Sequence, residues 1–311
     1  MRYRQLSQLG TLVSVLGFGA SPLGNEFCAI NPVEGTHAVR HAVANGINFF
    51  DVSPYYGRKL AEERLGQALS GLRDKVVIST KCGRYDTALF DFSASRVEAS
   101  LNESLRRLRT DYVDILYAHD IEFAGREQIV NETIPALKKL KQQGKARLIG
   151  VTGYPLKLLA DVAVRGAVDI VMSYCHYNLL ARDVDTDLAP ILKEHNIALV
   201  NASPFHMGIL SRAGAPAWHP APERVKQAGS KIIKLCETRG VNLPAAALRF
   251  CINHPYIAST LVGMFQPAQV DENLKALDTR LDPALMAEID RLAGADLNVT
   301  WASGLPENQD S

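Results

Sequence analysis

The sequence has almost no net charge, few cysteines and no long hydrophobic run, and each absence excludes a class of protein. Lysine and arginine total 34 against 33 aspartate and glutamate residues, which leaves a net charge of +1. This balance argues against a protein that a strong basic field holds on nucleic acid. With 47% hydrophobic residues the chain is too apolar for intrinsic disorder, so we expect a folded globular protein.

Hydrophobic stretches and cysteines exclude further classes. No apolar run approaches the roughly 18–20 residues that a membrane-spanning helix requires, and residues 1–5 lead into no apolar segment of a secretory signal. The five cysteines are odd in number and contain no Cys-x-x-Cys pair, and no cluster of side chains has metal-ligand spacing. We therefore expect reduced thiols in a cytoplasmic protein, with no membrane association and no metal.

Short apolar runs alternate with helical patterns along the whole chain. Each run is almost continuously apolar, as in strands buried on both faces of a parallel sheet. The eight runs are 15–19, 47–50, 76–80, 112–117, 146–151, 170–173, 198–201 and 259–262. The helical patterns that follow them are 37–44, 60–69, 93–108, 131–143, 157–164, 187–194, 222–238 and 267–277. Eight strand–helix units predict an α/β protein, a (β/α)8 TIM barrel over residues 15–277.

Two segments are predicted outside the barrel. Residues 3–15 contain two short apolar stretches around Gln8-Leu9-Gly10-Thr11, a pattern typical of a β-hairpin that covers the bottom of a barrel. Residues 283–292 are predicted to form an extra C-terminal helix, and a polar tail completes the segment 283–311. Because no low-complexity linker interrupts the sequence, we expect a single domain over residues 1–311.

Polar side chains follow three consecutive predicted strands at the points where the strands end. Asp51 and Tyr56 follow the second strand, Lys81 the third and His119 the fourth. The carboxyl ends of barrel strands meet at one face, and charged groups there are costly to bury unless they pair. A phenol has a pKa of about 10, which an adjacent ammonium lowers. The pattern predicts Tyr56 as general acid–base, tuned by Lys81 that Asp51 holds, with His119 hydrogen bonding the reacting oxygen.

These four residues, together with Gly46-Ile47-Asn48-Phe49-Phe50-Asp51 around the second strand, resemble the aldo-keto reductase superfamily. Other similar stretches are 15–19, 147–152 and 269–273, and the resemblance runs from about residue 9 to residue 292. It implies a (β/α)8 barrel and a nicotinamide dinucleotide bound without a Rossmann motif. It also implies that Asp51, Tyr56, Lys81 and His119 form the catalytic tetrad.

Several loops further resemble those of the NAD-dependent aldose 1-dehydrogenases, a group that includes plant-type L-galactose dehydrogenases and D-threo-aldose (L-fucose) dehydrogenases. The loops are 19–24, 53–57, 80–85, 90–94, 119–123, 173–177 and 218–220. The resemblance implies oxidation of a sugar such as L-galactose or L-fucose at C1 to the lactone. Expected substrate contacts besides Tyr56 and His119 are Tyr85, His176 and Trp218, although His176 could equally pack in the interior and Trp218 anchor its loop.

The residues near the eighth strand favour NAD over NADP. By the resemblance, NADP-preferring members hold the 2′-phosphate with a lysine and an arginine, and the matching positions carry the uncharged Gly263 and Gln269. A phosphate requires charge-assisted donors to offset its desolvation. Glu272 is then expected to accept a hydrogen bond from a ribose hydroxyl, unless it only caps or solvates its helix.

Other cofactor contacts are expected by the same resemblance. The usual asparagine and tyrosine around the nicotinamide are replaced here by Gly153 and Ala202, so Ser173, Tyr174 or Phe205 is expected to supply those contacts. The expected cofactor-binding residues are Gly19, Ser21, Asp51, Ser173, Ser203, Pro204, Gly263, Met264, Gln269, Glu272 and Asn273.

Two other functions remain open on this framework. A pyridoxal 4-dehydrogenase or a general carbonyl reductase would use the same tetrad. A cofactor-binding regulatory subunit, similar to the potassium-channel β subunits, would keep the barrel but serve in binding, and the full tetrad argues against it. The expected partner is a small-molecule sugar, with no nucleic acid, and the expected assembly is a monomer or a weak homo-oligomer.

Overall fold

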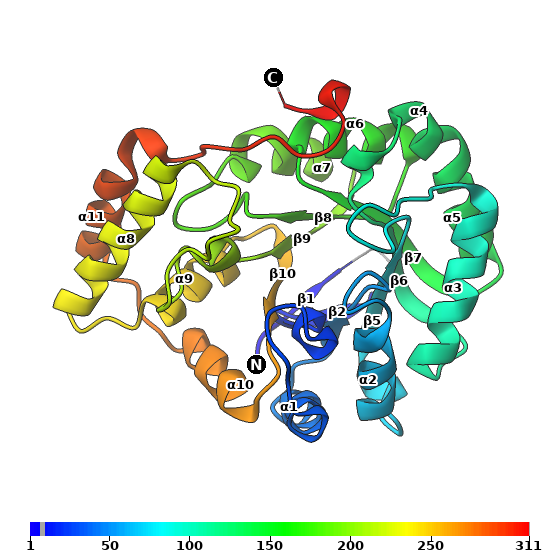
Figure 1. Ribbon diagram of the computed structural model, residues 1–311, viewed down its shortest axis with the longest axis horizontal. Coiled ribbons are helices and arrows are strands. Elements are labelled where there is room, and N and C mark those ends of the chain that lie inside the picture. Colours follow the sequence, from blue (N-terminus) through cyan, green and yellow to red (C-terminus); the bar gives the residue numbers. More distant parts are fainter. Residues whose placement is uncertain (7–9, 311) are drawn as a thin grey trace.

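The computed structural model describes residues 1–6 and 10–310, and its centre is a closed barrel of eight parallel strands (Figure 1). Around the barrel the strands follow the order β10-β3-β4-β5-β6-β7-β8-β9. Their bounds are β3 Leu16–Gly19, β4 Phe49–Asp51, β5 Val77–Cys82, β6 Val113–Ala118, β7 Ala146–Gly153, β8 Ile170–Tyr174, β9 Ala198–Ala202 and β10 Ile257–Gly263. The prediction of a (β/α)8 barrel is confirmed.

Helices surround the strands because each turns one apolar face inward. In α3, Val97, Leu101, Leu105 and Leu108 recur at helical spacing and are buried. The helices that follow the strands in turn are α1 Pro32–Ala44, α2 Leu60–Ala68, α3 Ala94–Leu108, α5 Ile134–Gln142, α6 Leu156–Gly166, α7 Ala189–Glu194, α9 Leu243–Ile252 and α10 Pro267–Leu274. A short helix α4, Arg126–Gln128, and a wide helical turn, Ile129–Thr133, precede α5, so this helix starts differently from the predicted 131–143.

The predicted seventh barrel helix, 222–238, is present as α8, Glu223–Thr238, but it lies outside the barrel wall. It packs against the extra C-terminal helix α11, Pro283–Ala293, at the left of Figure 1. The helix beside β10 is α9, which the sequence reading missed because its apolar and polar residues do not alternate at helical spacing. Helices α8, α9 and α11 enclose a second apolar core that includes Ile232, Ala247 and Ile289.

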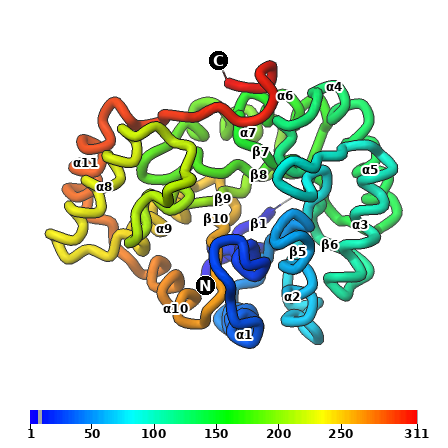
Figure 2. Tube along the Cα trace, viewed as in Figure 1, coloured from blue at the N-terminus to red at the C-terminus, as the bar shows by residue number. Residues whose placement is uncertain are grey.

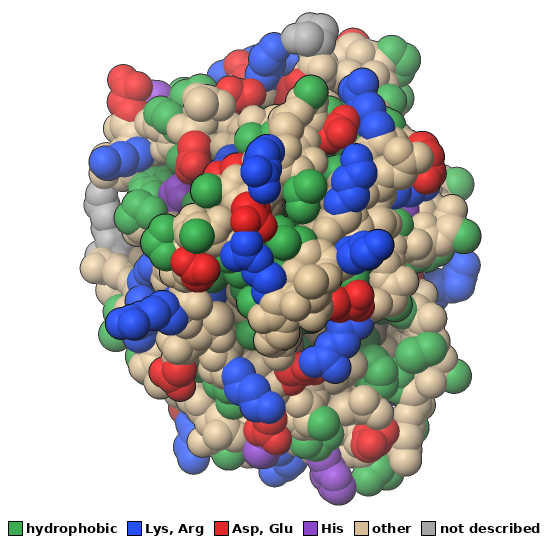
Figure 3. All heavy atoms as spheres, turned by 90° about the vertical axis from the view of Figure 1, so that its left-hand side faces the viewer, with side chains coloured by type: hydrophobic (Ala, Val, Ile, Leu, Met, Phe, Trp, Pro, Cys, Tyr) green, Lys and Arg blue, Asp and Glu red, His purple; other side chains and the backbone are tan. Residues whose placement is uncertain are grey.

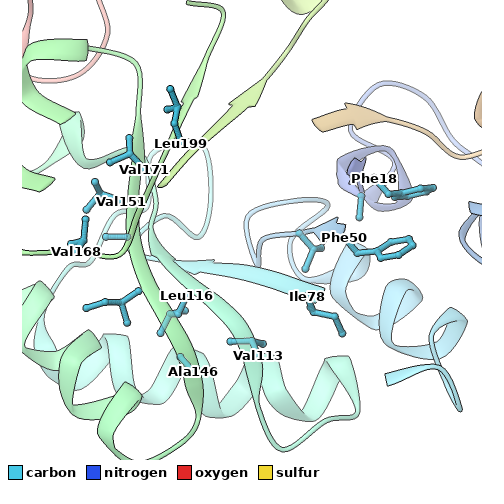
Figure 4. Close-up of a cluster of buried hydrophobic side chains, with 14 of the residues drawn as sticks. Phe18, Phe50, Ile78, Val113, Leu116, Ala146, Val151, Val168, Val171 and Leu199 are labelled. Atoms are coloured by element: carbon cyan, nitrogen blue, oxygen red, sulfur yellow. The ribbon is translucent and has the colours of Figure 1, made fainter. Parts of the chain in front are cut away.

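Strand side chains alternate between the barrel interior and the outer layer, as the two-residue repeat requires. Phe49, Ile115 and Val200 belong to the interior cluster, whereas the neighbouring Phe50 and Leu116 belong to the main core together with helix residues. Figure 4 draws part of this main core, including Phe50 and Leu116. The barrel is therefore filled on both sides of its wall, and the free ends of its strands are where polar groups can gather.

The hairpin closes the bottom of the barrel. Strands β1, Tyr3–Gln5, and β2, Leu12–Ser14, pair antiparallel, and Val13 of β2 joins the interior cluster together with Leu6, which follows β1. The Arg4 guanidinium donates to the backbone carbonyls of residues 252, 254 and 257, which fastens the hairpin to the start of β10. The predicted turn at 8–11 falls partly on residues 7–9, which lie outside the described residues.

The C-terminal segment continues from α11 on the opposite, carboxyl side of the barrel, where the red tube in Figure 2 passes α7 and α6. On the face that carries α8 and α11, basic and acidic side chains are interspersed rather than segregated (Figure 3). Within residues 1–6 and 10–310, none of the helices combines the length and hydrophobicity needed to cross a bilayer.

Candidate active site

The four polar residues predicted from strand ends meet at the carboxyl ends of β4, β5 and β6. Asp51 ends β4, Lys81 lies near the end of β5, and His119 follows β6 directly. The Lys81 ammonium donates to Asp51 Oδ2 at 2.7 Å, to the Val52 carbonyl at 3.0 Å and to the Tyr56 hydroxyl oxygen at 3.1 Å. All three ammonium hydrogens therefore have acceptors, which is the condition for burying a lysine at 1% exposure.

A buried pair of hydroxyl groups fixes the surroundings of this network. Ser79 Oγ donates to Asp51 Oδ1 at 2.6 Å, so both carboxylate oxygens are occupied. Ser53 Oγ lies 3.1 Å from His119 Nδ1. The His119 ring stands edge-on to Tyr56, with ring centroids 5.8 Å apart and an interplanar angle of 87°. The phenol and the imidazole consequently share one small region, which suits two hydrogen-bonding groups acting on one substrate oxygen.

The electrostatics of the tetrad correct one prediction. Burial raises the pKa of Tyr56 to about 12, and the Lys81 ammonium opposes this rise without overcoming it. The expected net lowering of the Tyr56 pKa is therefore not found. Although burial disfavours its charge, Asp51 and the Tyr56 oxygen hold the pKa of Lys81 above its ordinary value. Burial lowers the pKa of His119 to about 3, so its imidazole is neutral at physiological pH.

Two residues beside the tetrad were not predicted. Asp120 Oδ2 lies 3.6 Å from His119 Nε2. The same oxygen accepts a hydrogen bond from Arg84 Nη1 at 2.5 Å. The Arg84 guanidinium also stacks over Tyr55, 4.0 Å from the ring centroid. Asp120 adopts a left-handed backbone conformation with φ of 54°. The adjacent acid in His119-Asp120 was the available signal, since a charged residue after a buried strand needs a partner.

The three further substrate-contact predictions have different outcomes. His176 is buried, and its Nδ1 lies 2.7 Å from Asp183 Oδ2, while its Nε2 has no partner among the described residues. It lines a cavity of about 160 Å³ with Tyr154 and Trp301. Trp301 was missed because it lies in a segment read only as a polar tail.

Tyr85 and Trp218 lie in other surroundings. The Tyr85 hydroxyl accepts a hydrogen bond from the Gly83 amide at 3.1 Å, and Arg96 of α3 covers its ring at 4.3 Å. These contacts hold the Tyr85 ring against α3, and its role as a substrate contact stays a prediction. Trp218 is 57% exposed and stacks beside His219 on its loop.

The predicted cofactor contacts at the ends of β3, β8 and β10 lie on the same side of the barrel as the tetrad. Gly19 and Gly263 pair at the ends of their strands, and Met264 is buried next to them. At the end of β8, the Ser173 hydroxyl is fully buried and has no partner among the described residues. An unsatisfied hydroxyl of this kind fits the carboxamide of a nicotinamide, which offers both a donor and an acceptor.

The residues of α10 are engaged differently from the expectation. Gln269 Oε1 accepts from the backbone amides of Phe265 and Gln266, so its side chain caps the helix. Glu272 Oε1 accepts from Arg212 Nη2 at 2.6 Å, which brings a cation beside the predicted ribose contact. Asn273 is buried on the same helix.

The remaining expected cofactor contacts lie on connections after strands. Ser21 begins the short helical turn Ser21–Gly24 behind β3. Ser203, with a left-handed φ of 59°, and Pro204 follow the end of β9. These three residues are thus on the carboxyl side of the barrel with the tetrad.

Comparison with known proteins identifies the family of this chain. The model of the "Aldo/keto reductase family" matches residues 15–293. The chain is 44% identical to the L-galactose dehydrogenase of Arabidopsis thaliana, with 98% of both chains covered. It is 30% identical to a D-threo-aldose 1-dehydrogenase of a Pseudomonas species, covering 90% of this chain and 94% of the other. An aldo-keto reductase of Bacillus halodurans in its holo form superposes with a TM-score of 0.80 over 100% of both chains at 26% identity. The chain therefore belongs to the aldo/keto reductase family.

Proposed function

We propose that the protein oxidises an aldose at C1 to the lactone, with NAD as the hydride acceptor and Tyr56 as the general acid–base. The observation that carries this proposal is the single ammonium of Lys81 shared between Asp51 at 2.7 Å and Tyr56 at 3.1 Å. Such a contact stabilises a phenolate, and no such stabilisation is needed by a tyrosine that only packs. The similarity to L-galactose and D-threo-aldose dehydrogenases supports a sugar as the substrate.

The residues of the chain divide the chemistry between them. The bound nicotinamide would supply the acceptor for the hydride that leaves C1. Tyr56 takes the proton of the C1 hydroxyl after giving up its own proton, and Lys81 stabilises the phenolate in between. The neutral imidazole of His119, held by Ser53 at 3.1 Å, orients the same hydroxyl. Asp51 keeps the ammonium in place, so the proton acceptor is positioned before substrate arrives.

The proposed cofactor is NAD because no cation stands at positions 263 and 269. Gln269 is committed to the helix cap, and Gly263 has no side chain to reach a phosphate. The nearby Arg212 is paired with Glu272. The Glu272 carboxylate is negatively charged and would repel a 2′-phosphate. We also retain the expectation of a cytoplasmic monomer or weak homo-oligomer as part of this proposal.

A steady-state assay tests the function directly. Purified protein is incubated with L-galactose, L-fucose and D-arabinose and with NAD or NADP, and absorbance reports the reduced cofactor. We expect turnover with at least one of these sugars, a higher kcat/KM with NAD, and loss of turnover in Tyr56→Phe. Turnover of pyridoxal but of none of the sugars would replace this proposal by a pyridoxal dehydrogenase, to which the chain is 26% identical.

A regulatory role predicts a different result in the same assay. The chain is 28% identical to a probable potassium-channel β subunit of Arabidopsis thaliana. A protein of that kind would reduce its bound cofactor once and then turn over too slowly for steady-state detection. A single-turnover burst without further product, for every substrate in the panel, is the outcome that would favour it.

A further inference from the structure

Glu122 is a fully buried carboxyl group that the proposed reaction does not use. It lies three residues after His119, within the helical turn Ile121–Phe123. Its Oε1 accepts from the Tyr154 amide at 3.2 Å and from Ser303 Oγ at 3.0 Å. Its Oε2 has no partner among the described residues and faces Gly153, where a Cβ would lie only 2.5 Å away. These surroundings leave a charged carboxylate undersolvated and favour its neutral form.

The C-terminal segment 301–310 lies across the loops that follow β6, β7 and β9. The Trp301 ring stacks on Tyr154 behind β7, with centroids 4.5 Å apart, and meets His206 behind β9 edge-on at 5.5 Å. At its other end, the Asp310 carboxylate accepts from the Leu156 amide at 2.6 Å and so caps α6. The segment thus lies on the loops after β6, β7 and β9 at the carboxyl side of the barrel, and it passes α7 and α6 at the top of Figure 2.

Between these anchors the segment is fastened to the His119 loop. The Glu122 carbonyl accepts from the Leu305 amide at 2.8 Å and from Asn308 Nδ2 at 3.0 Å. Asn308 Nδ2 also donates to the Ala124 carbonyl at 2.8 Å. Gly304 adopts a left-handed φ of 82°, and a Cβ there would collide with the Glu122 carbonyl. The approach of the two segments is therefore too close for any residue but glycine.

We propose that Glu122 is a positioning residue for the aldose reaction, and that its carboxyl group, through Ser303, holds segment 301–310 on the loops that follow β6 and β7, a contact that we call the latch. The positioning role, which we expect to change the KM for the aldose, rests on the proposed function. The contact between Glu122 and the segment does not. Glu122 lies in the turn Ile121–Phe123, which follows His119 closely in the chain. Contacts that hold this turn therefore also hold the loop that carries His119. Lifting the segment would expose Glu122 to water and free the Trp301 side of the 160 Å³ cavity.

The latch makes docking of the segment depend on pH. Burial, and then the nearby Asp120, raise the pKa of Glu122 to about 8, against 4.5 in water. The docked form therefore binds more protons between these values, so docking is strongest below about pH 4.5. It weakens by up to about tenfold per pH unit as the pH rises to about 8, and it is constant above that.

Other titratable groups lie around Glu122 and along the segment. Asp120 is paired with Arg84, and burial holds the pKa of Tyr174 well above its ordinary value. Burial likewise raises the pKa of Tyr154 far above the window. Asp310 lies at the opposite end of the segment, and its carboxylate bonds to α6 rather than to Glu122. His206 and His219 stand edge-on to Trp301, so comparison with Glu122→Gln is what assigns the pH dependence to Glu122.

Fluorescence and amide exchange test the latch without substrate or cofactor. The chain has two tryptophans, so Trp218→Phe leaves Trp301 as the only one. In this background we expect Trp301 emission and the protection of the Leu305 amide to report undocking as pH rises from about 5 to 8. Adding Glu122→Gln, which keeps the shape but cannot ionise, should abolish that dependence and keep the segment docked at high pH.

Asp310→Asn provides the matched control at the other anchor. It should weaken docking at every pH while leaving the pH slope unchanged. If the Glu122→Gln protein fails to fold, Ser303→Ala replaces it, because it removes one hydrogen bond to Glu122 Oε1 from the segment side and should weaken docking below pH 8. Wild-type pH dependence in Glu122→Gln, or equal docking of Ser303→Ala and its parent, overturns the latch.

Kinetics then test the positioning role. The KM for the aldose should rise between about pH 6 and 8 in the parent protein and stay level in Glu122→Gln, whereas kcat should differ little between the two proteins at each pH. A level KM in both proteins would contradict the positioning role even where fluorescence supports the latch. If no aldose is oxidised at all, the proposed function fails, while emission and amide exchange still decide whether Glu122 holds the segment.

Discussion

The Tyr56 hydroxyl oxygen lies 3.1 Å from Lys81 Nζ, yet the pKa of Tyr56 stays at about 12. Burial and charge act on this phenol in opposite directions, and burial is the larger effect. The contact with Lys81 therefore keeps a deeply desolvated tyrosine within reach of deprotonation without making it a phenolate at rest. This balance determines how the activity should respond to mutation and to pH.

Lys81→Met should remove the charge that opposes the desolvation of Tyr56. We expect kcat to fall by roughly 10²–10⁴-fold, the usual contribution of a positioned acid–base group. The variant also leaves Asp51 unpaired, so it should lose about 3–5 kcal/mol of stability. Kinetics and urea unfolding measure the two effects. The double variant Lys81→Met/Asp51→Asn should recover stability but not activity; near-normal turnover in either protein would refute the role of Lys81.

Oxidation and reduction should depend on pH differently. Below a pKa of about 12 the phenolate fraction of Tyr56 grows about tenfold per pH unit, so log kcat/KM for oxidation should rise with a slope near one between about pH 8 and 10. Carbonyl reduction needs the protonated phenol and should be level over that range. His119 stays neutral throughout because burial lowers its pKa to about 3. An oxidation rate that is already level at pH 8 contradicts this prediction.

Glu272→Gln should shift the cofactor preference towards NADP. The substitution removes the carboxylate that holds Arg212 at 2.6 Å, which leaves the guanidinium available to a 2′-phosphate. We expect the ratio of kcat/KM for NADP to that for NAD to rise about tenfold, the effect of one charge-assisted hydrogen bond. Adding Arg212→Ala should cancel the gain. If the ratio does not change, the adenosine ribose of the cofactor does not bind beside α10, and the prediction is wrong.

Arg107→Ala should strongly destabilise the outer layer of the barrel. Its Nε donates to Glu62 Oε2 at 2.7 Å, and Glu62 Oε1 accepts from Thr80 of β5 at 2.6 Å. Glu62 is fully buried, so loss of the cation should cost about 3–5 kcal/mol in urea unfolding. The double variant Arg107→Ala/Glu62→Gln should regain much of that loss. A cost below about 1 kcal/mol for the single variant would show that the pair is dispensable.

The barrel and the meeting of its four polar residues were predictable because both depend on short-range patterns. Continuous apolar runs report strands buried on both faces, and residues after such runs lie at one end of the barrel by topology. Asp51, Lys81 and His119 followed from this argument alone. The seventh helix was assigned wrongly, because α8 has a clear amphipathic pattern whereas α9, buried among other helices, does not.

The contacts that the sequence did not reveal depend on pairs from distant segments. Gln269 caps its own helix, and Glu272 meets Arg212 from the loop after β9. Trp301 reaches Tyr154 only because the C-terminal segment returns to the loops that follow β6 and β7. The Tyr56 pKa was misjudged for a similar reason: Lys81 is visible in the sequence, whereas the extent of desolvation is a property of the packed site.

The pairing of β3 with β10 joins the first and the last strand of the barrel, with Leu16 opposite Thr260. During synthesis, β3 leaves the ribosome long before its second neighbour exists. Its free edge, and that of β9, therefore stay open to wrong partners until residue 263 has been made. The slowest step of folding is expected to be this closure, because it joins the most distant strands in the chain. Arg4, which bonds to the carbonyls just before and within β10, is placed to stabilise the closed ring once it forms.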